Sequence, residues 1–150
     1  MPLSRTGMIG ASHLPADAVQ PQWSPDGRWI AFVRLGKLEV VRTVGVGAPR
    51  VLAGWVVGGF SWSPNSKLLA CFCGPNREHV RFTTIAPAGT HRKVLWANRS
   101  LHYLSEDSED RPQWSRDSAR LVFLARVGPG YPPLQVWVVS ADGTGLNRIA

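Results

Sequence analysis

Residues 21–32 read PQWSPDGRWIAF, and two later stretches repeat the phrase, FSWSPNSKLLAC at 60–71 and PQWSRDSARLVF at 112–123. Aligned without gaps, the three copies superpose a tryptophan, the serine that follows it, and an apolar trio near the end. Between the serine and the trio stands a cluster of turn-forming residues that joins two extended runs. Each copy therefore predicts a β-hairpin, and the repetition indicates a repeat architecture.

Each copy continues with a third apolar run, a turn of small residues and a fourth short run. The third runs lie at 38–42, 79–85 and 134–140, and the fourth runs at 50–52, 93–95 and 148–150. Four strands in meander order are typical of a propeller blade. The repeated tryptophans are 39 and 52 residues apart, against about 40 to 50 for propeller repeats. The extra length falls at 96–111, where we expect a loop and not a strand.

The phrase resembles the TolB-type, WD-like propeller repeat, whose signature is Pro-x-Trp-Ser-Pro-Asp-Gly, two residues, then Ile-Ala-Phe. The first copy matches almost letter for letter; the second departs at Phe60 and Asn65-Ser66, and the third at 116–118. The resemblance covers about residues 19–150 and implies an all-β fold of three four-stranded antiparallel blades in an open arc. It implies little about function, because this repeat serves unrelated proteins.

The repeats also predict how the chain is organised. We expect a lead-in or a remnant of a preceding blade at 1–18, blades at 19–54, 55–97 and 111–150, and an inserted acidic loop at 98–110. Three blades are fewer than the roughly four to eight that close a ring. We favour a portion of a larger propeller, and the alternative is self-association, in which two copies complete a six-bladed ring.

Composition excludes several classes of protein. The net charge of +7 is spread along the chain, so we expect an ordinary surface and no nucleic-acid partner. No apolar run is long enough for a membrane span and no signal peptide is present. The compartment is undetermined; a genuine start at Met1 would indicate the cytoplasm.

Cys71 and Cys73 lie two apart on one strand. We expect them to be small buried hydrophobic residues, without a disulfide or a metal site.

The sequence offers no catalytic constellation. The segment from Gly59 to Ser63 resembles a Gly-x-Ser-x-Gly nucleophile elbow, but it lies inside the repeat and runs into a strand rather than a helix. The four histidines have no ligand or triad spacing. We therefore expect no enzyme, no cofactor and no metal. The acidic stretch 105–110 could offer oxygen ligands to a cation, although a solvated loop is the favoured interpretation.

Binding is expected at one rim of the arc, because loops joining second and third strands lie on the same side as the connections between blades. Aromatic and arginine side chains gather in these loops, a composition enriched in binding hot spots. The candidate binding residues are Arg77, Arg99, His102, Tyr103, Arg126 and Tyr131.

The predicted function is a non-enzymatic scaffold for a protein, peptide or glycan partner. The alternative is a fragment of the gating propeller of a prolyl-oligopeptidase-like serine peptidase. The repeated Trp23, Trp62 and Trp114 are expected to pack between blades, and Asp26 and Asp117 to fix the turns.

Overall fold

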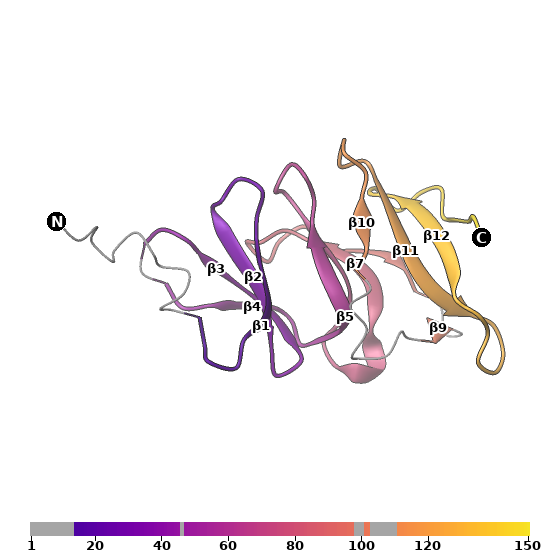
Figure 1. Ribbon diagram of the computed structural model, residues 1–150, viewed down its shortest axis with the longest axis horizontal. Helices are drawn as coiled ribbons and strands as arrows, with labels where there is room; N and C mark the ends of the chain where they lie inside the picture. The colour runs from indigo at the N-terminus through magenta and orange to yellow at the C-terminus, as the bar shows by residue number, and fades with distance from the viewer. Residues whose placement is uncertain (1–13, 46, 98–100, 103–110) are drawn as a thin grey trace.

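A computed structural model describes residues 14–45, 47–97, 101–102 and 111–150 and contains three four-stranded antiparallel sheets in a row (Figure 1). Each sheet is a meander of consecutive strands, and we number the sheets as blades 1 to 3. Blade 1 consists of β1 (Val19–Trp23), β2 (Trp29–Arg34), β3 (Lys37–Arg42) and β4 (Arg50–Ala53). Blade 2 consists of β5 (Trp55–Trp62), β6 (Leu69–Gly74), β7 (Arg81–Ile85) and β8 (Lys93–Trp96). Blade 3 consists of β10 (Gln113–Trp114), β11 (Arg120–Val127), β12 (Gln135–Ser140) and β13 (Asn147–Arg148). The predicted all-β open arc of three blades is confirmed.

The first hairpin shows why the repeated phrase folds as it does. The Ser24 hydroxyl donates to Oδ1 of Asp26 at 2.6 Å and accepts the Trp29 N–H at 3.0 Å. The same carboxylate oxygen accepts the Arg28 N–H at 3.0 Å. Inside the tight turn, side-chain oxygens thus accept the backbone N–H groups that strand pairing does not satisfy. Asp26 fixes the turn in this way, as predicted.

Blades 2 and 3 repeat these contacts. Asn65 occupies the place of Asp26 in blade 2, and Asp117 in blade 3, where its carboxylate accepts the hydroxyl of Ser115 at 2.6 Å and the N–H of Ala119 at 3.0 Å. The prediction for Asp117 is confirmed as well. An asparagine oxygen fulfils the same role, so the departure of the second copy from the signature leaves the turn intact.

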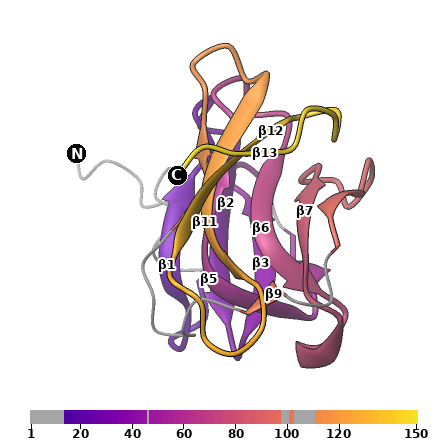
Figure 2. The same ribbon diagram turned by 90° about the vertical axis from the view of Figure 1, so that its right-hand side faces the viewer.

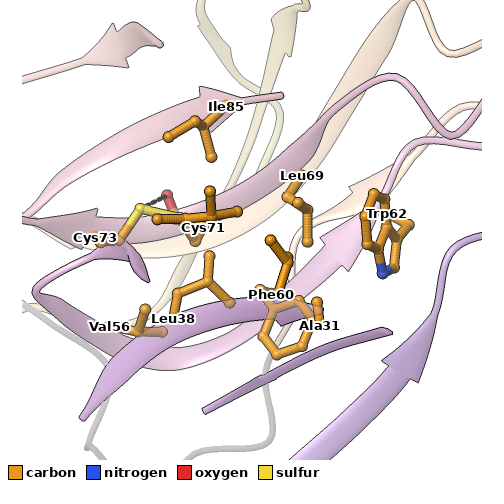
Figure 3. Packing of buried hydrophobic residues seen from close by; sticks show 12 residues of the cluster. Ala31, Leu38, Val56, Phe60, Trp62, Leu69, Cys71, Cys73 and Ile85 are labelled. Atoms are coloured by element: carbon orange, nitrogen blue, oxygen red, sulfur yellow. Dashed lines mark hydrogen bonds between the residues drawn. A yellow bond between two sulfur atoms is a disulfide. The ribbon is translucent and has the colours of Figure 1, made fainter. Parts of the chain in front are cut away.

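The cores lie between blades rather than within them. Alternate residues of each strand face opposite neighbours, so one side of blade 1 packs on one side of blade 2. Figure 3 shows this first joint, where Ala31 and Leu38 of blade 1 meet Phe60, Leu69 and Ile85 of blade 2. A second cluster joins blades 2 and 3, and its aromatic centre contains Phe72, Phe82 and Phe123.

The two cysteines correct one expectation. Cys71 and Cys73 are buried, as predicted, but a disulfide joins them, and the prediction of no disulfide is wrong. Residues two apart on β6 point to the same face, and their Cα atoms are 5.4 Å apart, within the span that a disulfide bridges.

Two short elements were also not foreseen. A 3₁₀ helix, η2 (Arg77–His79), precedes β7, and the Asn76 side chain caps it by accepting the N–H groups of Glu78 and His79. Within the segment expected to be a loop, β9 (Leu101–His102) pairs with the far end of β11. It forms there because β11 has eight residues and β10 only two, which leaves an unpaired edge.

The repeated tryptophans behave differently from one another. Trp62 is buried between blades 1 and 2 and Trp114 is half-buried between blades 2 and 3, as predicted. Trp23 is 60% exposed. The expectation that Trp23 packs between blades is therefore wrong for the described chain, because no blade precedes blade 1 there.

Candidate functional site

The loop-rich rim is the edge that carries the loops from second to third strands together with the connections between blades, along the lower edge of Figure 1. The Val56 N–H donates to the Gly36 carbonyl at 2.8 Å, which fastens the turn of blade 1 to the first strand of blade 2. The opposite edge carries the turns between first and second strands and the connections between third and fourth strands, and we call it the tight-turn rim.

Arg126 and Tyr131, both predicted site residues, form one pair on this rim. Arg126 stands near the end of β11 and donates from Nη1 to the Pro132 carbonyl at 2.6 Å. Its guanidinium carbon lies 4.4 Å from the centroid of the Tyr131 ring, a cation–π distance. The Tyr131 side chain is nevertheless 78% exposed. The loop therefore presents an aromatic ring to solvent in an orientation that a hydrogen-bonded arginine supports.

His102 is brought to the same place by its backbone. It lies in β9 directly opposite Arg126 of β11 in the antiparallel pairing. The other two predicted residues of this region, Arg99 and Tyr103, lie outside the described residues, as does most of the acidic loop. Three of the six predicted residues thus meet at the end of blade 3.

Arg77 belongs to a separate pair on blade 2. Its guanidinium carbon lies 5.0 Å from the centroid of the Trp55 ring. The indole of Trp55 also lies against Gly36, where an added Cβ would be 2.6 Å from a ring carbon. Trp55 packs against the core between blades 2 and 3. The sequence placed Trp55 and Arg77 on the same rim but gave no signal that they stack.

The sequence did not predict a hollow at the edge of the arc where the first strands of the blades lie. It measures about 750 Å³ and lies beside the first strands of the blades, where Gln22, Ser61, Arg111 and Gln113 contribute polar groups. This volume is within the range of ligand pockets, roughly 300–1,000 Å³. Among the described residues, the Ser61 hydroxyl is buried without a hydrogen-bond partner. The available signal was position, because Gln22, Ser61 and Gln113 each precede a repeated tryptophan.

Three aspartates have lowered pKa values, and none of them lines this hollow. The pKa values of Asp26 and Asp117 are lowered, chiefly because the hydroxyls of Ser24 and Ser115 donate to them. The pKa of Asp142 is lowered mainly by the hydroxyl of Thr144. All three fix hairpin turns of the tight-turn rim, which is the role that their hydrogen bonds explain. Across the described ranges, no cluster of three or more His, Cys, Asp or Glu side chains could hold a metal ion.

Among the described residues, no helix has both the length and the apolar character needed to cross a membrane.

Comparison with known proteins gives a fold and no family. No family profile matches the chain, and no curated protein matches its sequence. Prolyl oligopeptidase B from Galerina marginata, with a bound 25-residue macrocyclization substrate, is similar in structure at a TM-score of 0.62 and 17% identity. The likeness covers 91% of this chain and 23% of that one.

The ligand-free form of the same fungal enzyme is similar at a TM-score of 0.58 and 17% identity, over 87% of this chain and 21% of that one. A TolB-like protein from Agrobacterium tumefaciens has a TM-score of 0.42 and 18% identity, over 87% of this chain and 60% of that one. This chain thus spans about a quarter of the length of the fungal enzyme. At this identity the likeness to the enzyme shows the β-propeller fold alone.

Proposed function

We propose that this chain is a non-catalytic propeller portion whose loop-rich rim binds a protein or peptide partner, with glycans as the other ligand class of the same surface. The observation that carries the proposal is the pair of Arg126 and Tyr131. An exposed aromatic ring and an arginine held by a backbone carbonyl are the residue types that dominate binding hot spots. The ring is already oriented, so binding loses little side-chain entropy.

The charge of this rim indicates the kind of partner. Arg77 and Arg126 each lie over an aromatic ring, on neighbouring blades of the same edge. Arginine can bind a carboxylate through two parallel hydrogen bonds while its flat face stays stacked. We therefore favour a peptide segment that combines an acidic side chain with an apolar or aromatic neighbour.

The test is selection of peptides from a random display library against the immobilised chain. Binders should be enriched in acidic and aromatic residues, and Tyr131→Ala should weaken them at least tenfold. Because Tyr131 is mostly exposed, the variant should keep the circular dichroism spectrum and unfolding midpoint of the parent chain. Arg28→Ala on the tight-turn rim, whose side chain is 77% exposed, is the matched control. Selected peptides that bind Tyr131→Ala as tightly as the parent chain would refute the assignment, and a glycan array read with the same variants tests the other ligand class.

A second candidate is a piece of a propeller that precedes a peptidase domain. The overlay of 91% of this chain on part of prolyl oligopeptidase B favours considering it. The test is the reading frame that encodes the chain: a downstream hydrolase domain with a Gly-x-Ser-x-Gly elbow would support this candidate. A frame that encodes only further blades would count against it.

A further inference from the structure

Blade 3 presents an open sheet face, and Figure 2 looks directly onto it. In that view β11 and β12 lie toward the viewer, and the C-terminal segment with β13 crosses only their upper part. Four apolar side chains on this face are only half-buried, namely Val122, Leu124, Val136 and Val138. Their backbone pairings are Val122 with Val138 and Leu124 with Val136, so they form one compact patch.

The repeat shows what this patch does elsewhere in the chain. In blade 1 the equivalent positions are Ala31, Val33, Leu38 and Val40, and in blade 2 they are Ala70, Phe72, Phe82 and Thr84. Apart from the partly buried Val33, all of these side chains are buried, each set beneath the blade that follows. The patch on blade 3 is thus the same docking face without its cover.

The joints between blades also share a set of hydrogen bonds. The indole of Trp62 donates to the Gln22 carbonyl at 3.2 Å, and the indole of Trp114 donates to the Ser61 carbonyl at 3.3 Å. In both cases a tryptophan of the later blade reaches the residue that precedes the tryptophan of the earlier blade. At the first joint the Gln22 amide returns a bond to the Phe60 carbonyl at 3.0 Å.

A second shared bond lies in the turns. The Asp26 N–H donates to the Ser66 hydroxyl at 2.9 Å, and the Asn65 N–H donates to the Ser118 hydroxyl at 3.1 Å. Both serines have positive φ, 64° and 61°, in a region that favours glycine. Each serine accepts its bond from the blade before it, which gives a reason for a hydroxyl at this strained place.

Blade 3 has both of the groups that the earlier blade contributes to these hydrogen bonds. Gln113 stands where Gln22 stands, and Asp117 where Asp26 stands. In the part of the chain that the structure describes, no indole reaches the Gln113 carbonyl and no hydroxyl accepts the Asp117 N–H. A hollow of about 220 Å³, lined in part by Gln113, Val122 and Val138, opens beside them.

The opposite end of the arc is partly covered. On blade 1, Ile30, Phe32 and Val41 are buried, and Leu14 and Ala18 pack against them. In blades 2 and 3 the matching positions receive the preceding blade. Leu14 and Ala18 therefore cover part of the face that a preceding blade would take, while Trp23 stays exposed.

We propose that the outer face of blade 3 binds a further four-stranded blade of the same repeat, one that brings a tryptophan to the Gln113 carbonyl and a turn hydroxyl to the Asp117 N–H. A second copy of this chain is the poorer occupant for two reasons. Its blade 1 has Leu14 and Ala18 over the docking side, and it has Gly27 where the hydroxyl is required.

The test supplies such a blade from the chain itself. Residues 1–150 are followed directly by a second copy of residues 53–97, so that blade 2, with its own tryptophan and turn serine, begins at the natural spacing. Hydrogen exchange is measured for amides 116–124 in the extended and the unextended chain. Docking should slow exchange of the Asp117 amide at least tenfold, because it gains an acceptor and loses contact with water.

The matched control is Leu124→Lys in both chains. In the unextended chain the substitution should change the unfolding midpoint much less than in the extended chain, because Leu124 is only partly buried there. In the extended chain it should abolish the added protection. Unchanged exchange on extension would overturn the proposal. So would sedimentation of the unextended chain as a dimer that Leu124→Lys dissociates, because the face would then belong to a second copy. Neither outcome involves the loop-rich rim, so the proposed function is tested separately.

Discussion

Trp23 and Trp62 occupy the same place in the repeat, so their replacement by alanine isolates the effect of a neighbouring blade. Trp62 is 8% exposed and its indole donates across the joint; Trp23 is 60% exposed and no blade stands beyond it in the described chain. We predict that Trp62→Ala destabilises the chain much more than Trp23→Ala.

The magnitude follows from burial. Removing a buried tryptophan costs about 3–5 kcal/mol, of which the hydrogen bond to Gln22 contributes about 1 kcal/mol. Trp23 has roughly two-fifths of its surface in contact with the protein, and water fills the space that it leaves. Its replacement should cost about 1 kcal/mol or less. Trp62→Phe keeps most of the burial and loses the donor, so an intermediate cost of about 1–2 kcal/mol is expected.

The assay is equilibrium unfolding in urea followed by far-ultraviolet circular dichroism, because tryptophan fluorescence itself changes in these variants. Each free energy is taken from the midpoint and the slope. Equal costs for Trp23→Ala and Trp62→Ala, or a larger cost for Trp23→Ala, would refute the view that this residue stabilises the fold through the joint between blades.

Three further predictions test the turns and the rim. Ser66→Ala should lower the urea midpoint more than Ser66→Gly, because both variants lose the acceptor for the Asp26 N–H but glycine also relieves the positive φ. The pKa values of Asp26 and Asp117 are lowered from 3.8, so the stability that they add is present above that pH and is lost as the pH falls through the lowered values. Replacing both by asparagine should therefore flatten acid unfolding monitored by circular dichroism below about pH 4, and an unchanged acid limb would contradict this. Gly36→Ala should lower the melting temperature, since the new Cβ would meet the Trp55 ring and φ is 77° there; a melting temperature equal to that of the parent chain would contradict the close packing.

Much of the fold could be predicted because each repeat carries the same local signals for its strands and turns. The Trp-Ser and turn cluster mark each hairpin, and the apolar trio marks the second strand. What escaped prediction depends on contacts between distant parts of the chain. The pairing of Leu101–His102 with β11 arises from unequal strand lengths, and the exposure of Trp23 from the absence of a preceding blade among the described residues.

The candidate site was predicted less well, for a related reason. Composition indicated an aromatic and arginine-rich rim, and Arg126 with Tyr131 indeed form a pair. Sequence alone could not reveal that Arg77 stacks on Trp55 instead of joining them, because that contact depends on how two loops approach in space. Nor could it reveal the hollow beside the first strands, whose walls come from all three blades.

The departures of the later copies from the signature have a structural meaning that the first copy clarifies. Gly27 is the residue that suits a positive φ of 71°, whereas Ser66 and Ser118 adopt nearly the same φ with a side chain. A residue held in this conformation persists only where surrounding contacts compensate for it. Each of these two serines accepts a hydrogen bond from the preceding blade, and Gly27, on the side of the arc that Leu14 and Ala18 cover, has no such blade to bind among the described residues. Glycine in blade 1 and serine in blades 2 and 3 thus distinguish the two ends of the arc: blade 1 has no serine to accept a bond from a preceding blade, and blade 3 has an Asp117 N–H that a following blade could use.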